Sequence, residues 1–557
     1  MLFPVLRCHD SQYNRLQATF DKTGEKFMLF LRKSFHVLHL IFFIGSFSSK
    51  ASAGTKPMPK EITFESLWYK GSVESAFEQS KKLNKPIFLY WGAVWCPPCN
   101  ELKTEVFSKP KFRDLIKSVI PVHLNGDTET AQKWGDRLKV SGYPTLLILD
   151  SNKQELLRIS ESLNIDEFEQ AFLAATALGK PIKEIINDAL TKDVSPQVWQ
   201  ALAYTHWEEM GEDLYDDAQL LEVSINLLEK VPSKLSEIRS VMIGKILRLS
   251  AHVSETKGQT PETQALLKQV GQLLPKLIAQ VFESEKTIIA ARSAILYDAG
   301  PILSWSKRQV SPAKLEALYA QWAQAGKVIQ TSEEASIDSK LWASYIPLEI
   351  FRLNKGTAVD LPQSLVMSIK NAVKQADQEA KTTYERKAVI TGAAYLLRKI
   401  GAFAEAKILL EKELKTTKTP WYIQSSLSRL AEAQNKPEQA LYWSAKARES
   451  ARGKATKIQW TVNDLLLTID LQPTNIVKIE KLLKDYYELA FSLNDGFLGR
   501  NKLRASKVLR AIKSLPASEK LKGALVNNSK SCKTLNDKNA LNCQEHFSSL
   551  LGAKQTI

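Results

Sequence analysis

The sequence Trp-Cys-Pro-Pro-Cys at residues 95–99 is the part of this chain best suited to chemistry. Two cysteines separated by two residues can form a reversible dithiol–disulfide pair, because one sulfur reaches the other across a single helical turn. An apolar run precedes them at residues 87–91, and a helix-like stretch follows at residues 100–107. A helix N-terminus offers free N–H groups and partial positive charge, which stabilise a thiolate. Since the thiolate is the nucleophile of disulfide exchange, the sequence predicts Cys96 and Cys99 as catalytic residues.

Further elements must position this pair. We expect a strand over residues 119–124, a helix over 128–138, a hairpin of strands over 145–150 and 155–160, and a closing helix over about 165–175. The segment Ser-Gly-Tyr-Pro-Thr at residues 141–145 lies just before the hairpin. This order resembles the thioredoxin fold. The resemblance implies a cis peptide bond before Pro144, with Trp95, Tyr143 and Pro144 as substrate-binding residues beside the cysteines.

The resemblance covers roughly residues 60–178 and can be made more specific. Residues 85–96, followed by Glu101, Phe107 and Pro110, are most similar to the branch that includes the periplasmic C-terminal domain of the thiol:disulfide interchange protein. Thioredoxins commonly carry a buried aspartate six residues before the first cysteine, where this chain has Tyr90. Glu101 either replaces that acid or is a solvated charge at a helix start. The group that deprotonates Cys99 is therefore left open.

Two other interpretations of the cysteine pair are a zinc site and a degenerate, non-catalytic thioredoxin fold. Zinc would require a second Cys-x-x-Cys or paired histidines, and residues 60–180 contain only His123. Alternation along its strand favours a packing or surface role for His123. We therefore predict no metal and favour the redox pair.

The N-terminal segment has the layout of a secretory signal. An apolar run at residues 37–47 follows Arg32 and Lys33 and precedes Ala-Ser-Ala at 51–53. The run is shorter than the roughly 20 residues that span a bilayer. We predict a leader over residues 1–53, cleaved after Ala53, with translation starting at Met28. The protein is then exported, and we expect it in the periplasm.

Removal of the leader would also remove Cys8 and leave four cysteines: Cys96, Cys99, Cys532 and Cys543. An even number in an exported protein fits pairing. Cys532 and Cys543 lie in a polar C-terminal tail, residues 516–557, and are predicted to form a structural disulfide. A second redox pair or two free thiols are the alternatives.

Residues 180–515 have a different pattern, in which apolar residues recur at the spacing of amphipathic helices. Within residues 387–453, a helix–turn–helix pattern repeats after 34 residues, so that Gly401 and Ala406 correspond to Asn435 and Ala440. This period resembles the tetratricopeptide repeat. We predict an all-α solenoid with a possible protein partner on its surface. Six tryptophans are expected mainly in its core: Trp305, Trp322, Trp342, Trp421, Trp443 and Trp460.

The chain has a net charge of +16, and residues 1–53 hold seven basic and three acidic residues, which leaves +12 after cleavage. This charge is spread along the helices rather than gathered with aromatic residues, so nucleic-acid binding is not expected. No phosphate-binding or dinucleotide fingerprint is present, so no cofactor is predicted.

The combined prediction is an α/β thioredoxin-like domain at residues 56–178 followed by the helical solenoid. Its expected function is that of an exported thiol–disulfide oxidoreductase of the reductase type. It would act on protein thiols and disulfides and receive electrons from another protein, expected to be embedded in the membrane. Pro97 removes one donor from the Cys96 thiolate, which favours a reducing site. The competing interpretation is a non-catalytic exported scaffold that binds protein partners.

Overall fold

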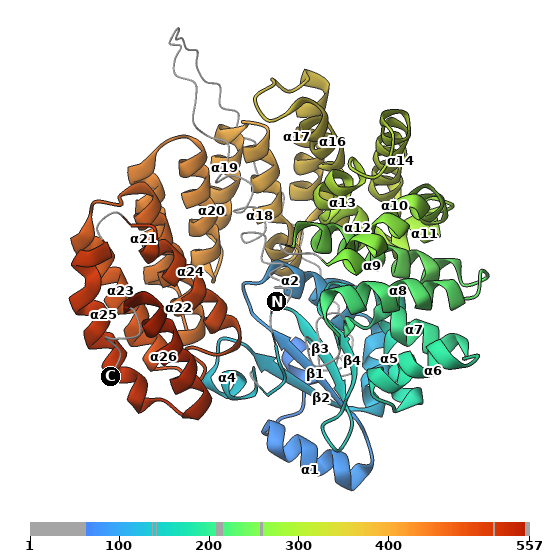
Figure 1. Ribbon diagram of the computed structural model, residues 1–557, viewed down its shortest axis with the longest axis horizontal. Helices are drawn as coiled ribbons and strands as arrows, with labels where there is room; N and C mark the ends of the chain where they lie inside the picture. Colours follow the sequence, from blue (N-terminus) through green and yellow to red (C-terminus); the bar gives the residue numbers. More distant parts are fainter. Residues whose placement is uncertain are drawn as a thin grey trace, which may run out of the picture.

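A computed structural model describes residues 63–135, 137–140, 142–207, 215–256, 260–515 and 518–551. It contains a small mixed sheet with helices, followed by a long all-α region (Figure 1). The predicted leader, including Met28 and Ala53, lies outside the described residues. The fold class predicted from the sequence is confirmed.

The sheet has four strands in the order β2-β1-β3-β4. Strand β1 pairs parallel with β2 and antiparallel with β3, and β3 pairs antiparallel with β4. The elements of this domain are η2 (Phe64–Leu67), α1 (Val73–Leu83), β1 (Ile87–Gly92), α2 (Pro97–Leu102), the π-helical turn η3 (Lys103–Phe107), α3 (Pro110–Leu115), η4 (Ile116–Ser118), β2 (Ile120–Asn125), α4 (Glu129–Gly135), β3 (Thr145–Leu149), β4 (Glu155–Ile159) and α5 (Ile165–Leu178).

Strand β1 is buried along its whole length, because helices cover both faces of the sheet. Its side chains alternate between the faces. Phe88 packs against Phe112 and Phe168 on the side of α3 and α5. Trp91 lies on the other side, where Gly135 of α4 leaves room for its ring. This central strand leads directly into the cysteine segment and fixes its position.

The peptide bond between Tyr143 and Pro144 is cis, as the resemblance implied. The helix expected over residues 100–107 begins earlier, at Pro97, because Cys96 acts as its N-cap. Its second half is the π-helical turn. The closing helix runs from Ile165 to Leu178, three residues longer than expected, and ends at Gly179 with a positive φ of 56°.

The remaining described elements are all helical. They are α6 (Ile182–Thr191), α7 (Pro196–Tyr204), α8 (Asp217–Lys230), α9 (Ser236–Glu255), α10 (Pro261–Val281), α11 (Glu285–Ala290), α12 (Arg292–Tyr297), α13 (Ala299–Ser306), α14 (Pro312–Thr331), α15 (Ile337–Ala343), α16 (Ile346–Lys355), α17 (Gln363–Glu379), α18 (Thr383–Lys399), α19 (Phe403–Leu414), α20 (Pro420–Ala433), α21 (Pro437–Ser450), α22 (Lys454–Leu471), α23 (Ile476–Phe491), α24 (Gly499–Lys513), η7 (Ser518–Leu521), α25 (Lys522–Ser529), η8 (Lys530–Thr534) and α26 (Asp537–Leu551).

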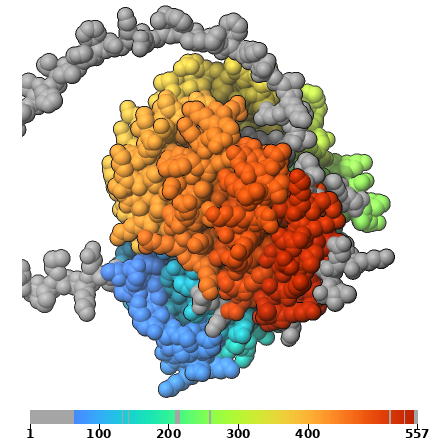
Figure 2. All heavy atoms as spheres, turned by 90° about the vertical axis from the view of Figure 1, so that its left-hand side faces the viewer, coloured from blue at the N-terminus to red at the C-terminus, as the bar shows by residue number. Residues whose placement is uncertain are grey.

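The helices form an arc around the sheet domain (Figure 1). The arc starts at α6 and α7, where α7 packs on α5, passes α18 next to α2, and returns at α22 next to α4. Figure 2 shows the orange and red helices of this arc lying directly against the blue sheet domain. The sheet domain is therefore contacted by helices from both halves of the arc.

Two helix hairpins, α18–α19 and α20–α21, match the 34-residue period. Gly401 and Asn435 occupy corresponding turns, and both have positive φ values, 74° and 52°. Ala406 and Ala440 are both fully buried where the paired helices approach. The two hairpins therefore share one local design. Of the six tryptophans expected in the core, Trp443 alone is only partly buried.

The buried apolar residues of the helices form two large hydrophobic cores and a small third cluster, in which Leu467 of α22 packs with residues of α20 and α21. One large core is continuous with the core of the sheet domain and reaches as far as Trp460. A second core lies within α22–α26 and runs from Ile458 to Leu551. The stretch at residues 516–557 was expected to be a polar tail. Its described part is instead helical and packs into this second core, because Leu521, Leu525, Phe547 and Leu551 turn their apolar side chains inward.

The structure joins Cys532 and Cys543 in a disulfide, with both residues buried in the second core. The double variant Cys532→Ser/Cys543→Ser is expected to lose about 3 kcal/mol of stability. The disulfide closes a loop between residues 11 apart in the sequence and so restricts the unfolded chain, and the variant removes this restriction. Thermal unfolding under non-reducing conditions would show a lower Tm. A reductant should then lower the Tm of the wild type much more than that of the double variant. An unchanged Tm in the double variant would contradict a structural role.

Candidate redox site

Cys96 and Cys99 are joined by a disulfide at the N-terminus of α2. The Cys99 N–H donates a hydrogen bond to Cys96 Sγ over 3.3 Å. Pro97 and Pro98 have no N–H, so Cys99 supplies the first donor of the helix. In the reduced state the same N–H would stabilise a Cys96 thiolate. This is the geometry that the spacing of the two cysteines predicted.

Asn100 braces the segment in front of the helix. Its Nδ2 donates hydrogen bonds to the carbonyl oxygens of Cys96, at 2.7 Å, and Val94, at 3.3 Å. The side chain is fully buried. These bonds fix the cysteine loop against α2, a role that the sequence analysis did not assign to Asn100.

The three predicted substrate-binding residues come together beside the disulfide. The ring of Trp95 meets the ring of Tyr143 edge-on, with centroids 5.6 Å apart. Pro144 follows Tyr143 through the cis peptide bond. Trp95 Nε1 donates a hydrogen bond to Asp127 Oδ2 over 3.1 Å. Asp127 therefore belongs to this edge, which we call the redox edge: Trp95, Cys96, Asp127, Tyr143 and Pro144.

Both cysteines are without exposed surface, and Trp95 and Tyr143 are only 2% and 6% exposed. The residues that cover them belong to the helical arc. Tyr422 of α20 and Trp460 of α22 pack on Trp95, with centroid distances of 5.6 and 6.4 Å. The redox edge of the sheet domain is thus covered by helices of the same chain.

The position of the missing buried aspartate is filled by an aromatic pair. The Tyr90 ring stacks on the ring of His123, its partner in β2, with centroids 5.0 Å apart. Burial raises the pKa of the Tyr90 hydroxyl, which has no hydrogen-bond partner among the described residues. Burial, together with the nearby charge of Lys103, lowers the pKa of His123 to about 4. A negative charge at this position is therefore absent at neutral pH.

Lys103 lies four residues after Cys99, so both side chains leave the same face of the helix. Its Nζ is 4.9 Å from the ring centroids of both Phe64 and Tyr384. Burial, with a smaller contribution from Lys387, lowers the pKa of Lys103 to about 8. Among the titratable side chains that the structure describes on α2 and η3, Lys103 lies closest to the helix face that carries Cys99.

Lys103→Met is expected to raise the stability of the protein at pH 7. Below about pH 8 the folded state must bury a cation that the unfolded state keeps in water, whereas between pH 8 and 10.5 only the unfolded lysine stays charged. The wild type therefore gains stability as the pH rises through this window, by at most about 3 kcal/mol. Thermal unfolding at pH 7 and pH 10 would show a higher Tm for the variant at pH 7 and a narrower difference at pH 10. A less stable variant at pH 7 would mean that the cation–π contacts outweigh the burial of charge.

Glu101 is buried, which excludes the interpretation as a solvated charge at the helix start. It accepts a hydrogen bond of 2.5 Å from the Ser336 hydroxyl in the loop before α15. Burial raises the pKa of Glu101, and burial followed by the nearby Glu101 raises that of Asp338. Two residues along a helix rotate a side chain by about 200°, so Glu101 faces away from Cys99. It does not occupy the position of the missing acid.

No three His, Cys, Asp or Glu side chains gather as metal ligands in the part of the chain that the structure describes. Over the same residues, none of the helices combines the length and the apolar character needed to cross a bilayer.

The fold and the cysteine pair together define a thioredoxin-like domain. Residues 67–151 match the model of a family described as thioredoxin-like. A stretch of 99 residues is 28% identical to the thiol:disulfide interchange protein DsbD of Salmonella typhi, and it spans 17% of this chain and 17% of that relative. The domain, this similarity and the Cys96–Cys99 pair suggest a thiol–disulfide oxidoreductase.

A solved circular tandem repeat protein, described as having a novel repeat topology and enhanced subunit contact surfaces, matches 69% of this chain and 84% of its own at 13% identity. Its TM-score is 0.17, too low to imply a shared fold. The tetratricopeptide-like repeat assignment stays a prediction.

Several residues of the site were not found from the sequence. Asn100 follows the second cysteine directly, and a polar residue at a helix start is a weak signal for bracing. Asp127 follows β2, where loops near a sheet edge often carry function. No local pattern could identify Tyr422 or Trp460, because they reach the redox edge from more than 300 residues away in the sequence.

Proposed function

We propose that this protein is an exported thiol–disulfide oxidoreductase of the reductase type that acts on protein disulfides. One observation carries the proposal. The Cys96–Cys99 disulfide lies at the start of α2, with a backbone donor on Cys96 Sγ and a cis-proline next to Tyr143 at the same edge. A reversible nucleophile and a backbone segment able to pair with an extended peptide therefore lie together.

In the proposed reaction the Cys96 thiolate attacks one sulfur of a substrate disulfide. A Cys96–substrate disulfide forms, and the other substrate sulfur leaves as a thiolate and takes up a proton. Cys99, after losing its proton, then attacks Cys96 Sγ. The Cys96–Cys99 disulfide forms, and the second substrate thiolate leaves. The protein dithiol has lost two electrons, and the substrate disulfide has gained them.

The direction of exchange depends on how strongly the Cys96 thiolate is stabilised. Pro97 and Pro98 remove two N–H donors, and the Cys99 N–H is the hydrogen bond that the structure gives to Cys96 Sγ. Weak stabilisation of the thiolate favours the disulfide form and hence a reducing enzyme. A protein dithiol donor must then regenerate the reduced pair, and we propose a membrane-embedded donor. A potential near −120 mV, as in strong periplasmic oxidants, would contradict the reductase direction.

Export to the periplasm is part of the proposal and rests on the signal-like layout of residues 28–53. The Cys532–Cys543 disulfide supports it, because such bonds persist in oxidising compartments. N-terminal sequencing of the mature protein should give Gly54 as the first residue. A mature chain that still begins at Met1 would contradict this part.

The proposed activity is tested by trapping with Cys99→Ser. Without the resolving thiol, Cys96 should accumulate mixed disulfides with partner proteins that a reductant releases. The double variant Cys96→Ser/Cys99→Ser is the matched control and should give none. No reductant-sensitive adducts with Cys99→Ser would contradict exchange with protein substrates.

The burial of both cysteines favours a second candidate, a non-catalytic exported scaffold. In that case partners would bind through the helical arc, for which a tetratricopeptide-like surface is a proposal. The same partners would then co-purify with the double variant without a covalent bond. The two candidates therefore give opposite results in one experiment.

A further inference from the structure

The redox pair cannot exchange disulfides in the form that the structure shows. Disulfide exchange requires an attacking sulfur to contact Cys96 Sγ. Neither Cys96 nor Cys99 has any exposed surface. The two aromatic residues that should receive a substrate, Trp95 and Tyr143, are buried as well. A substrate protein must therefore displace something before it can react.

The displaced group would be the C-terminal part of the helical arc. The guanidinium of Arg500 on α24 lies 4.4 Å from the centroid of the Tyr143 ring. Trp460 of α22 packs on Trp95. Thr456 of α22 donates a hydrogen bond to Asp127, the same carboxylate that accepts from Trp95. Trp95, Asp127 and Tyr143 are thus contacted by α22 and α24, and Trp95 is contacted also by Tyr422 of α20.

These helices have a core of their own. The second hydrophobic core is formed within α22–α26, whereas Trp460 of α22 packs in the core that the sheet domain shares with the preceding helices, and Leu467 packs on α20 and α21. A unit with most of its apolar side chains in its own core can move while exposing little of its neighbour's interior. We call this unit, residues 454–551, the C-terminal unit.

Most contacts between the C-terminal unit and the redox edge are polar. Arg500, Thr456 and Asp127 are groups that water can solvate when the surfaces part, whereas Trp460 on Trp95 is an apolar contact. The other side of the sheet domain is held differently, since Arg292 of α12 forms a buried bidentate ion pair with Glu167 of α5. The attachment at α5 is therefore the firmer one.

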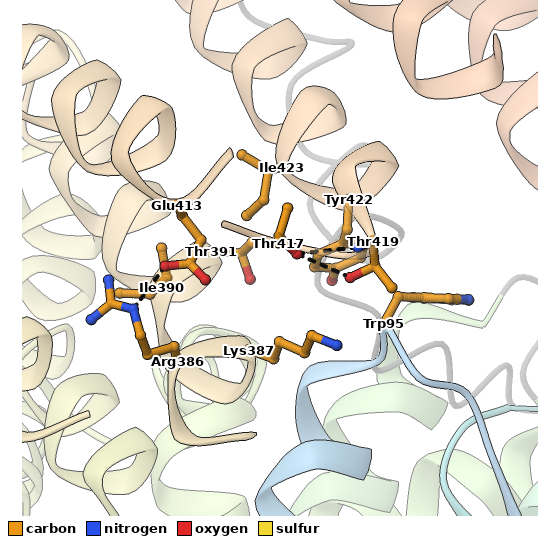
Figure 3. A pocket seen from close by; sticks show the side chains of 10 residues that line it. All are labelled: Trp95, Arg386, Lys387, Ile390, Thr391, Glu413, Thr417, Thr419, Tyr422 and Ile423. Atoms are coloured by element: carbon orange, nitrogen blue, oxygen red, sulfur yellow. Dashed lines mark hydrogen bonds and ion pairs between the residues drawn. The ribbon is translucent and has the colours of Figure 1, made fainter. Parts of the chain in front are cut away.

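Packing is incomplete at the seam beside Trp95. A small pocket lies between Trp95 and helices α18–α20 (Figure 3), and Tyr422 of α20 contacts the Trp95 ring beside it. Lys387 on its wall donates a hydrogen bond of 3.3 Å to the Val94 carbonyl. Arg386, also on its wall, pairs with Asp377 and Glu413 rather than with the sheet domain. Lys387 and Tyr422 are thus the residues of this wall that contact the cysteine segment.

We propose that the C-terminal unit is a built-in cover of the redox edge, and that the protein exchanges disulfides only after this cover has moved away from Trp95 and Tyr143. The role of this cover in disulfide exchange rests on the proposed function, whereas the test below measures only the accessibility of Cys96. Arg500 and Trp460 stand where a substrate would bind, so the cover and the substrate compete for one surface.

The test measures the reactivity of Cys96 in the reduced, folded full-length protein. A pulse of a bulky maleimide is followed by mass spectrometry of the peptides that contain Cys96 and Cys532. In the wild type, we expect Cys96 to react at least about a hundredfold more slowly than in urea, because opening limits the reaction. Arg500→Ala should speed the labelling of Cys96 by about tenfold, since the cation–π contact with Tyr143 is lost.

Arg510→Ala is the matched control, because this exposed arginine lies on the same helix α24. It should label as the wild type does. Thr456→Val replaces the hydroxyl that bonds to Asp127 with a methyl group and should also speed labelling. It serves as a second variant in case Arg500→Ala misfolds. Cys532 in the same samples reports unfolding of the C-terminal unit itself and should stay protected.

Fast labelling of Cys96 in the wild type, or equal rates in the wild type, Arg500→Ala and Thr456→Val, would overturn the cover. Equal acceleration at Cys96 and Cys532 would also overturn it, because the unit would then unfold rather than move. Faster labelling without any exchange with a disulfide-bonded peptide would leave the cover standing and contradict the proposed function instead.

Discussion

Cys96→Ser is expected to lower the rate of exchange with a disulfide-linked fluorescent peptide by at least about a thousandfold. A serine hydroxyl stays protonated at neutral pH and cannot replace the thiolate that attacks the substrate. The backbone donor at Cys99 and the aromatic contacts of Trp95 would remain, so the fold should be kept. Circular dichroism and the Tm should be close to those of the wild type.

Lys117→Ala is a suitable control, because this side chain lies on the surface of the same domain, 75% exposed. It should exchange at the rate of the wild type. Since the cover limits access, both variants are best compared also in the Arg500→Ala background, where the chemical step is more visible. A Cys96→Ser protein that keeps more than about a tenth of the wild-type rate would show that Cys96 is not the nucleophile.

The geometry of the cysteine pair could be predicted because it depends on residues close together in the sequence. The two cysteines and the helix start lie within residues 95–107, and the hydrogen bond from the Cys99 N–H to Cys96 Sγ follows from that spacing. The cis bond before Pro144 depended on a resemblance rather than on physics, since spacing alone does not select a cis isomer.

The environment of the site could not be predicted in the same way. A solvated charge at the helix start was one interpretation of Glu101, but the residue is buried and accepts a hydrogen bond from Ser336 in the loop before α15. The sequence shows Tyr90 at the position where thioredoxins commonly have an aspartate. It does not show that Tyr90 stacks on His123, because this contact depends on the parallel register of β1 and β2. Such contacts join segments far apart in the chain, and amphipathic periodicity says which face is buried but not against what.

The C-terminal region shows the same limit. Residues 516–557 are rich in polar and charged side chains, which suggested a tail. The few apolar residues, among them Phe547 and Leu551, are spaced so that one helix face can pack on α23 and α24. The disulfide then fixes this face in place. The average composition of this stretch is polar, whereas its packing depends on the spacing of four or five apolar residues.

Arg292→Met is expected to destabilise the protein by about 3–5 kcal/mol, because it leaves the Glu167 carboxylate buried without its partner. Arg292 Nη2 donates to Glu167 Oε2 over 2.6 Å, and Nη1 donates to the other carboxylate oxygen. Both side chains are buried, at 12% and 8% exposure. The cost is that of an uncompensated charge rather than the net value of the ion pair.

Lys111→Met provides the contrast, because Lys111 pairs with Asp166 and Glu169 at the start of the same helix α5 but is exposed to water. Its loss should change the urea midpoint far less than the loss of Arg292 does. The double variant Arg292→Met/Glu167→Gln should recover part of the loss, because the remaining side chain is then neutral. If Arg292→Met and Lys111→Met shift the midpoint equally, the buried pair does not hold the domain in the arc. The difference matters for the cover, since α5 must stay attached while α22 and α24 move.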